Sequence, residues 1–207
     1  MGIDPSLNST GICYSSYDPD ENKEYDMKFG IIHCNKLTKK EKIAEEKYKE
    51  IFQYYVFEDI PKEIAKKLSP SEFEYAKTIK LRNLIYELKN IISKLLYNCN
   101  YNRIYICIEG ISYGSTRTTK SIFDLAGLNY MIRFMLLELL KNQVTLIVSP
   151  PSNVKKFATG KGNANKEAMI ESFKIAFPEI ELPKIDDIGD AFFMKEIAKK
   201  VAKEEYD

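Results

Sequence analysis

Four acidic residues stand where the expected secondary structure would place a carboxylate beside a buried strand. Asp4 ends the short strand at the start of the chain, and Glu109 ends the β-rich run RIYICIE. Asp187 and Asp190 are three residues apart at the start of the last expected helix, so they share one helix face and can both point back at the sheet. Carboxylates at apolar strand ends need cations, because a buried charge without a partner is costly. The pattern indicates a metal site.

Oxygen ligands without histidine favour hard divalent cations at this site. The chain contains a single histidine, His33, which excludes a histidine-rich zinc site and is expected to be a strand residue with a satisfied partner. Mg²⁺ and Mn²⁺ prefer oxygen ligands and keep several waters for a substrate phosphate. Two such ions about 3.5–4 Å apart would clamp the attacking and leaving oxygens of a phosphodiester. We therefore expect two Mg²⁺ ions in each active site, for which Mn²⁺ can substitute.

Each aspartate also has a purely structural interpretation. Asp4 precedes Pro5 and could start a turn, and Asp187 or its neighbour Asp186 could cap the last helix. Glu109, at the end of an apolar strand, is less easily explained in this way. Taken singly, the aspartates leave both interpretations open.

A basic stretch runs from 150 to 166, where the sequence has four lysines and no acidic residue. The net charge of the whole chain is +1, which excludes a nucleic-acid partner bound by bulk charge but not one bound by a local patch. Gly160 and Gly162 permit close backbone approach, so a loop running into a helix N-terminus here has the charge and shape of a phosphate-binding site. A solvated lysine loop is the alternative. The four lysines are Lys155, Lys156, Lys161 and Lys166.

The segment from 110 to 119 adds hydroxyl groups, a cation and an aromatic ring. Its candidate DNA-binding residues are Arg117 and Tyr113, whose ring could stack on an unpaired base at a DNA junction. A plain surface tyrosine is the alternative interpretation of Tyr113.

The elements that must position these residues suggest an α/β fold. Strands are expected over 1–4, 11–17 and 25–34, with the turn-rich segment 18–22 joining the last two as a hairpin. The segment 37–68 is charge-dense and is expected to be a helical insertion.

A long helix should begin at a capping box. Ser69-Pro70-Ser71-Glu72 places proline at the first helical position, and apolar residues then recur every three or four residues until about Asn98. The β-α-β-α order that follows predicts a mixed sheet covered by helices, and the length of 207 residues suits a single domain over 1–207. The remaining expected elements are strands over 103–109 and 144–148 and helices over 121–140, 165–177 and 187–203.

Four motifs follow one another along the chain: Gly2-Ile-Asp-Pro-Ser-Leu-Asn-Ser-Thr-Gly11, Ile108-Glu-Gly110, Pro151-Ser-Asn-Val-Lys-Lys156 with Gly160-Lys-Gly162 and Lys166 behind it, and Asp187-Ile-Gly-Asp190. In this order they resemble the motifs of RuvC-like Holliday junction resolvases, which belong to the ribonuclease-H-like superfamily. The resemblance covers the chain from its start to about residue 200 apart from 37–68. The sequence of segment 112–125 resembles viral or phage members of this family more than the bacterial enzymes.

The resemblance implies a ribonuclease-H-like fold with a mixed five-stranded sheet flanked by helices, a homodimer, and Mg²⁺-dependent cleavage of branched DNA. It implies that the four acidic residues described above are the metal ligands and catalytic residues. It also implies that Lys155 and Lys166 lie near the scissile phosphate, with Lys166 among the catalytic residues. Asp4 and Glu109 are further apart in sequence than in compact bacterial members, and the excess coincides with 37–68.

The sequence therefore predicts a metal-dependent, structure-selective endodeoxyribonuclease that resolves four-way DNA junctions by paired symmetric nicks. A broader flap or fork nuclease and a non-catalytic junction-binding module are the alternatives. A phosphate-binding ATPase of the actin and sugar-kinase type would need a second lobe that 207 residues do not hold, so no nucleotide cofactor is expected. The helix over 121–140, apolar on nearly every face, would be overexposed in a monomer, which favours a twofold dimer.

Membrane contact and secretion are not expected. No charged segment followed by an apolar one opens the chain, and no apolar run reaches about 18 residues. The four cysteines form no C-x-x-C pair, which suggests free thiols in a reducing compartment. The expected location is cytoplasmic or nuclear, and the resemblance to viral and phage members allows a virus- or phage-infected cell as the setting.

Overall fold

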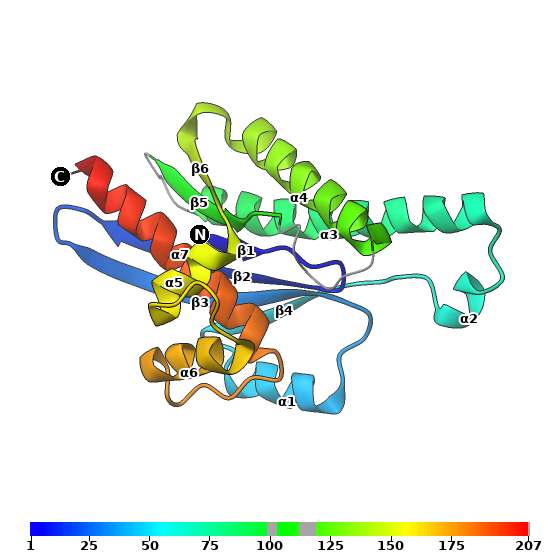
Figure 1. Ribbon diagram of the computed structural model, residues 1–207, viewed down its shortest axis with the longest axis horizontal. Coiled ribbons are helices and arrows are strands. Elements are labelled where there is room, and N and C mark those ends of the chain that lie inside the picture. Colours follow the sequence, from blue (N-terminus) through cyan, green and yellow to red (C-terminus); the bar gives the residue numbers. More distant parts are fainter. Residues whose placement is uncertain (99–102, 112–118, 207) are drawn as a thin grey trace.

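The computed structural model describes residues 1–98, 103–111 and 119–206. Within them, six strands form one mixed sheet in the order β4-β3-β2-β1-β5-β6 (Figure 1). β1 pairs antiparallel with β2, and β2 with β3, whereas the other neighbours run parallel. The strands are β1 (Gly2–Asp4), β2 (Ser9–Asp18), β3 (Lys23–Cys34), β4 (Phe52–Phe57), β5 (Ile104–Glu109) and β6 (Val144–Ser149).

Local sequence signals account for the predicted hairpin and the long helix. Asp18 stabilises the turn between β2 and β3, because its Oδ1 accepts the N–H groups of Asp20 and Glu21. The predicted capping box is present: Ser69 Oγ accepts the N–H of Glu72 at 3.4 Å, and the Glu72 carboxylate accepts the N–H of Ser69 at 2.8 Å. Helix α3 (Pro70–Asn98) therefore begins and ends where the sequence predicts.

The segment 37–68 differs from the prediction. It contains two helices, α1 (Lys39–Lys47) and the short α2 (Lys62–Ala65), but β4 lies between them and pairs in parallel with β3. The sheet therefore has six strands rather than the predicted five. In the aromatic run FQYYVF, Phe52 and Tyr54 pack in the core on one face of the sheet and Tyr55 and Phe57 pack on the other, which suits a strand better than a helix.

Helices cover both faces of the sheet, as the sequence predicts (Figure 1). α3 and α4 (Thr119–Leu140) pack on one face, and α1 lies on the other face together with the three C-terminal helices. This mixed sheet flanked by helices is the α/β architecture that the sequence predicts. None of the described helices is long and apolar enough to span a membrane. The C-terminal helices are α5 (Pro151–Thr159), α6 (Lys166–Ala176) and α7 (Ile185–Tyr206).

Candidate active site

Asp4 and Glu109 lie at the same end of two neighbouring parallel strands. In the register of β1 and β5, Gly2 pairs with Cys107 and Ile3 with Ile108, so Asp4 and Glu109 are the next residues on the two strands. Successive side chains alternate between the faces of a sheet. Asp4 and Glu109 therefore belong to the face that carries Gly2 and Cys107, which is the face covered by α7.

Two glycines bring α7 directly onto this face. A Cβ atom added at Gly11 would lie 2.2 Å from the carbonyl oxygen of Asp187, and one added at Gly2 would lie 2.0 Å from that of Ala191. Any side chain at either position would push the helix away. Gly11 is also the residue of β2 that pairs with Asp4. The sequence thus places the backbone of Asp187 beside the strand position next to Asp4.

Burial sets the electrostatics of the two α7 aspartates. Burial raises the pKa of Asp187, while a hydrogen bond from Ser9 Oγ to Asp187 Oδ2, 2.5 Å long, opposes this shift. Burial and the nearby carboxylates of Asp186 and Asp187 raise the pKa of Asp190 to about 6. The charges of Lys155 and Lys166 act in the opposite direction. Asp190 is therefore a partly buried carboxylate whose neighbouring positive charge does not offset the burial and the nearby carboxylates.

Lys166 forms an ion pair that the sequence does not predict. Its Nζ lies 2.6 Å from Asp186 Oδ2, and this hydrogen bond raises the pKa of Lys166. From the sequence alone, Asp186 is predicted only as a possible helix cap. Its position beside two other aspartates, together with a lysine at the start of the preceding helix, was the available signal.

Asn129 is a second functional candidate that sequence reasoning missed. Its side chain is 3% exposed, and its Nδ2 donates a 2.7 Å hydrogen bond to the carbonyl oxygen of Glu109. This contact ties the end of β5 to α4. A single amide among the apolar residues of α4 was the signal for a buried polar contact.

The basic stretch is partly helical rather than the predicted loop. Residues 151–159 form α5, which ends at Gly160 in the left-handed conformation with φ of 79°. Gly162 packs against the first turn of α5, where an added Cβ would lie 3.1 Å from the carbonyl oxygen of Ser152. Proline at the first helical position favours this start, which the glycines further along obscured. Close backbone packing, and not an open cradle, explains Gly162.

The four lysines of this stretch differ in their surroundings. Lys155 is half-buried and its charge acts on Asp190, whereas Lys156, Lys161 and Lys166 are exposed. The structure thus brings Lys155 and Lys166 to the acidic residues. Tyr113 and Arg117, the other two candidate DNA-binding residues, lie outside the described residues.

The donor set fits a divalent cation in its chemistry, although the ligands are not gathered into a closed shell. Among the described residues, no three His, Cys, Asp or Glu side chains converge closely enough to hold a metal ion as they stand. The carboxylate oxygens are hard donors, and the raised pKa values of Asp187 and Asp190 show that added positive charge would be favourable there.

His33 has the partners that the sequence analysis expected. Its Nδ1 lies 2.8 Å from Lys184 Nζ, and its Nε2 lies 3.9 Å from a carboxylate oxygen of Glu41. Burial and the charge of Lys184 lower the pKa of His33. The neutral ring therefore accepts a hydrogen bond from Lys184 in the stretch before α7.

The exposed side of α4 is apolar, as predicted for a monomer. Phe123, Tyr130 and Phe134 are 71%, 61% and 67% exposed, and Leu137 is 50% exposed. Leu136 belongs to the buried side of the same helix, with no exposed surface. The apolar α4 face therefore consists of Phe123, Tyr130, Phe134 and Leu137.

Comparison with known proteins gives two similar structures. No family model and no curated protein matches the chain. Among solved structures, it is similar to RuvC from Thermus thermophilus, with 14% identity over 98% of this chain and 95% of that chain, and a TM-score of 0.48. It is also similar to T. thermophilus RuvC in complex with a Holliday junction substrate, with 15% identity over 99% and 94% of the two chains, and a TM-score of 0.49. The likeness is one of fold.

Proposed function

We propose that the protein is a metal-dependent, structure-selective endodeoxyribonuclease that resolves four-way DNA junctions by paired symmetric nicks. The observation that carries this proposal is that Asp4 and Glu109 end the neighbouring strands β1 and β5 on the face covered by α7, the helix that carries Asp187 and Asp190. Lys155 of α5 and Lys166 of α6 supply positive charge beside the α7 aspartates. The resemblance of the sequence motifs to RuvC-like resolvases selects the four-way junction among branched DNAs. A Holliday junction is also the substrate in one of the similar structures.

The proposed metal ligands are Asp4, Glu109, Asp187 and Asp190, and Mg²⁺ is the expected ion. When bound, such ions activate water and stabilise the negative charge that develops on a phosphodiester. Ionised carboxylates are the ligands that Mg²⁺ requires, so the high pKa of Asp190 makes metal binding and proton release linked events.

Neighbouring residues of the chain orient these carboxylates and the DNA. The Ser9 hydroxyl holds Asp187 by its hydrogen bond, and Asn129 holds the backbone of Glu109. Lys155 and Lys166 lie beside the acidic residues, where their ammonium groups can contact the phosphates next to the cleaved bond. The ion pair with Asp186 keeps Lys166 at this edge of the sheet.

Paired nicking requires two active sites, and the apolar α4 face supports a homodimer as their source. This face exposes aromatic and aliphatic side chains that a twofold contact would cover. A symmetric dimer presents two equivalent sites to the two symmetry-related strands of a junction.

Cleavage of defined substrates tests the proposal. Labelled four-way junctions, flaps and plain duplexes are incubated with the protein with and without Mg²⁺. We expect Mg²⁺-dependent paired nicks in the junction and little cleavage of the duplex. Equal cleavage of flaps would instead indicate a broader branched-DNA nuclease, and junction binding without cleavage would indicate a binding module.

Salt dependence of junction binding tests Lys155 and Lys166 in the same preparation. Replacing Lys155 or Lys166 by alanine should reduce the slope of log affinity against log salt by about one unit each if the lysine contacts a phosphate. The exposed Lys200 of α7 provides a matched control, since it already pairs with Glu204.

A further inference from the structure

α7, the helix that carries Asp187 and Asp190, rests on the sheet over bare backbone. At Gly2, an added Cβ would lie 2.0 Å from the carbonyl oxygen of Ala191 and 2.4 Å from the amide nitrogen of Lys195. Gly11 lies in the same way beneath Asp187. Interlocking side chains normally fix a packed helix along its axis. Gly2 and Gly11 have no side chain that could interlock with α7. The contact at these two positions is therefore close but does not by itself fix the helix along its axis.

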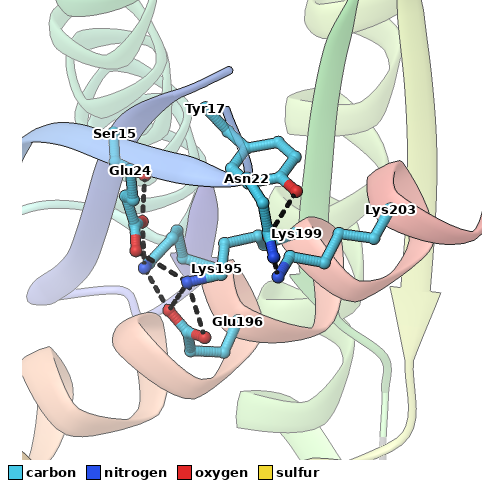
Figure 2. Close-up of polar contacts among 8 residues, drawn as sticks. All are labelled: Ser15, Tyr17, Asn22, Glu24, Lys195, Glu196, Lys199 and Lys203. Carbon is cyan, nitrogen blue, oxygen red and sulfur yellow. Dashed lines mark hydrogen bonds and ion pairs between the residues drawn. The ribbon is translucent and has the colours of Figure 1, made fainter. Parts of the chain in front are cut away.

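A buried ion pair provides a specific attachment next to the two glycine contacts. The Lys195 side chain is 2% exposed, and its Nζ lies 2.5 Å from Glu24 Oε1 on β3 and also contacts Glu196. Ser15 Oγ donates a 2.5 Å hydrogen bond to the same Glu24 oxygen, and Lys199 Nζ lies 2.7 Å from the other. Figure 2 shows these side chains reaching from α7 and the β2–β3 hairpin toward one another.

The charge state of Glu24 makes the attachment strong. Burial opposes ionisation, but the hydrogen bonds from Lys195, Lys199 and Ser15 outweigh it and lower the pKa of Glu24 to about 2. The carboxylate is therefore ionised throughout the neutral range, with both oxygens bonded.

The attachment lies on the same helix face as the candidate metal ligands. Asp187, Ala191, Lys195 and Lys199 recur every four residues along α7, so they form one stripe toward the sheet. Lys195 is about two helical turns, roughly 12 Å, beyond Asp187. Because a helix moves as a rigid rod over this length, a shift at Lys195 would move Asp187 by a similar amount.

We propose that the Glu24–Lys195 ion pair fixes the position of α7 along its axis on β1 and β2, and that both residues thereby position Asp187 and Asp190. The role of the two aspartates rests on the proposed function, whereas the position of the helix does not. Buried ion pairs add little net stability compared with apolar residues of similar size, and their best-supported role is to specify register.

An apolar replacement of the pair separates register from stability. The double variant Glu24→Leu/Lys195→Met should keep a thermal midpoint near that of the wild type. It should nevertheless bind Mn²⁺ about tenfold or more weakly in isothermal titration, because the carboxylates are no longer held in place. Its kcat for nicking should fall while its KM for junction DNA is unchanged, since the lysines of α5 and α6 are untouched.

Matched variants complete the comparison. Lys200→Met/Glu204→Leu replaces an exposed ion pair on the same helix and should leave Mn²⁺ affinity unchanged. The reversed pair Glu24→Lys/Lys195→Glu should bind Mn²⁺ more tightly than Glu24→Leu/Lys195→Met, although less tightly than the wild type. Wild-type Mn²⁺ affinity in Glu24→Leu/Lys195→Met would overturn the proposal.

Disulfide trapping reads the helix position without any activity. Ser9 and Asp187 touch through their side chains, so a Ser9→Cys/Asp187→Cys protein, with Cys99 replaced by serine, should cross-link rapidly under mild oxidation. Adding Glu24→Leu/Lys195→Met should slow cross-linking several-fold, and an unchanged rate would contradict the register role. If cross-linking slows but the wild type never nicks DNA, the register role stands and the proposed function fails.

Discussion

The two faces of the sheet hold their helices by different means. On the α3 and α4 face, the contact consists of fully buried aliphatic side chains such as Ile12, Ile108 and Leu88. On the α7 face, small residues let the helix approach, and buried polar groups and ion pairs lie within the contact. Both faces have an extensive apolar core, but the contact of α7 with β1 and β2 adds close backbone approach and buried polar groups beside the candidate carboxylates.

The largest expected effect comes from removing a carboxylate on the α7 side of the sheet. Asp4→Asn or Glu109→Gln should lower the rate of junction nicking about a thousandfold or more, because each would remove a metal ligand worth several kcal/mol in the transition state. Junction binding in a metal-free gel shift should persist. The exposed Asp26→Asn is the matched control. Retained nicking in Glu109→Gln would remove that carboxylate from the proposed site.

The next effect tests the close approach of α7. Gly11→Ala places a methyl group where 2.2 Å separates an ideal Cβ from the Asp187 carbonyl oxygen, so the helix must move and nicking should fall about a hundredfold. For stability, the comparison is Gly127→Ala on α4, where nothing lies within 4 Å of the added carbon. That change should instead stabilise the protein by about 0.5–1 kcal/mol, measured by urea unfolding. Wild-type nicking by Gly11→Ala would show that the α7 face tolerates displacement.

A substitution on the α3 and α4 face of the sheet should lower stability without weakening metal binding. Leu88→Ala removes a fully buried side chain of α3 and should cost about 2–5 kcal/mol of unfolding free energy. The Mn²⁺ affinity of the folded variant should stay near the wild-type value, because α3 does not carry the candidate ligands. A large loss of Mn²⁺ affinity at full folding would mean that the two faces are not separable.

The smallest expected effect is a pH dependence confined to the α7 face. The pKa of Asp190 is raised from 3.8 to about 6, so its proton stabilises the folded state below pH 4, and this contribution is lost as the pH rises through 6. Added Mg²⁺ should offset the loss above pH 6 by binding the ionised carboxylates. Urea midpoints from pH 4 to 7.5, with and without Mg²⁺, measure both effects. Asp190→Asn should flatten the profile, and an unaltered profile would assign the titration to another group.

The sequence predicted the regular elements well where one local pattern dominated. The turn-rich segment 18–22 indicated the hairpin of β2 and β3, and the capping box at Ser69 fixed the start of α3. β4 was missed because its six residues lie between charge-dense segments of helical character, and only pairing with β3 makes them a strand. α5 was missed because the glycines that follow it suggested a loop.

The candidate site was predictable only in part. The strand ends marked Asp4 and Glu109, and helical spacing marked Asp187 and Asp190, but their catalytic roles stay predictions. Contacts between distant parts of the chain left no local pattern. The Glu24–Lys195 pair joins residues from opposite ends of the sequence, so neither residue differs locally from an ordinary surface charge.

β4 has a consequence for how separate copies of the protein meet. Without it, the long strand β3 would form the margin of the sheet and present a row of free N–H and C=O groups, which is a template for edge-to-edge aggregation. β4 pairs with the part of β3 from Phe29 to Cys34. The outer margin of β4 is itself protected against pairing with another strand. There the Glu45 carboxylate accepts the Tyr54 N–H at 2.8 Å, so a neighbouring strand would meet a negative charge in place of an open donor.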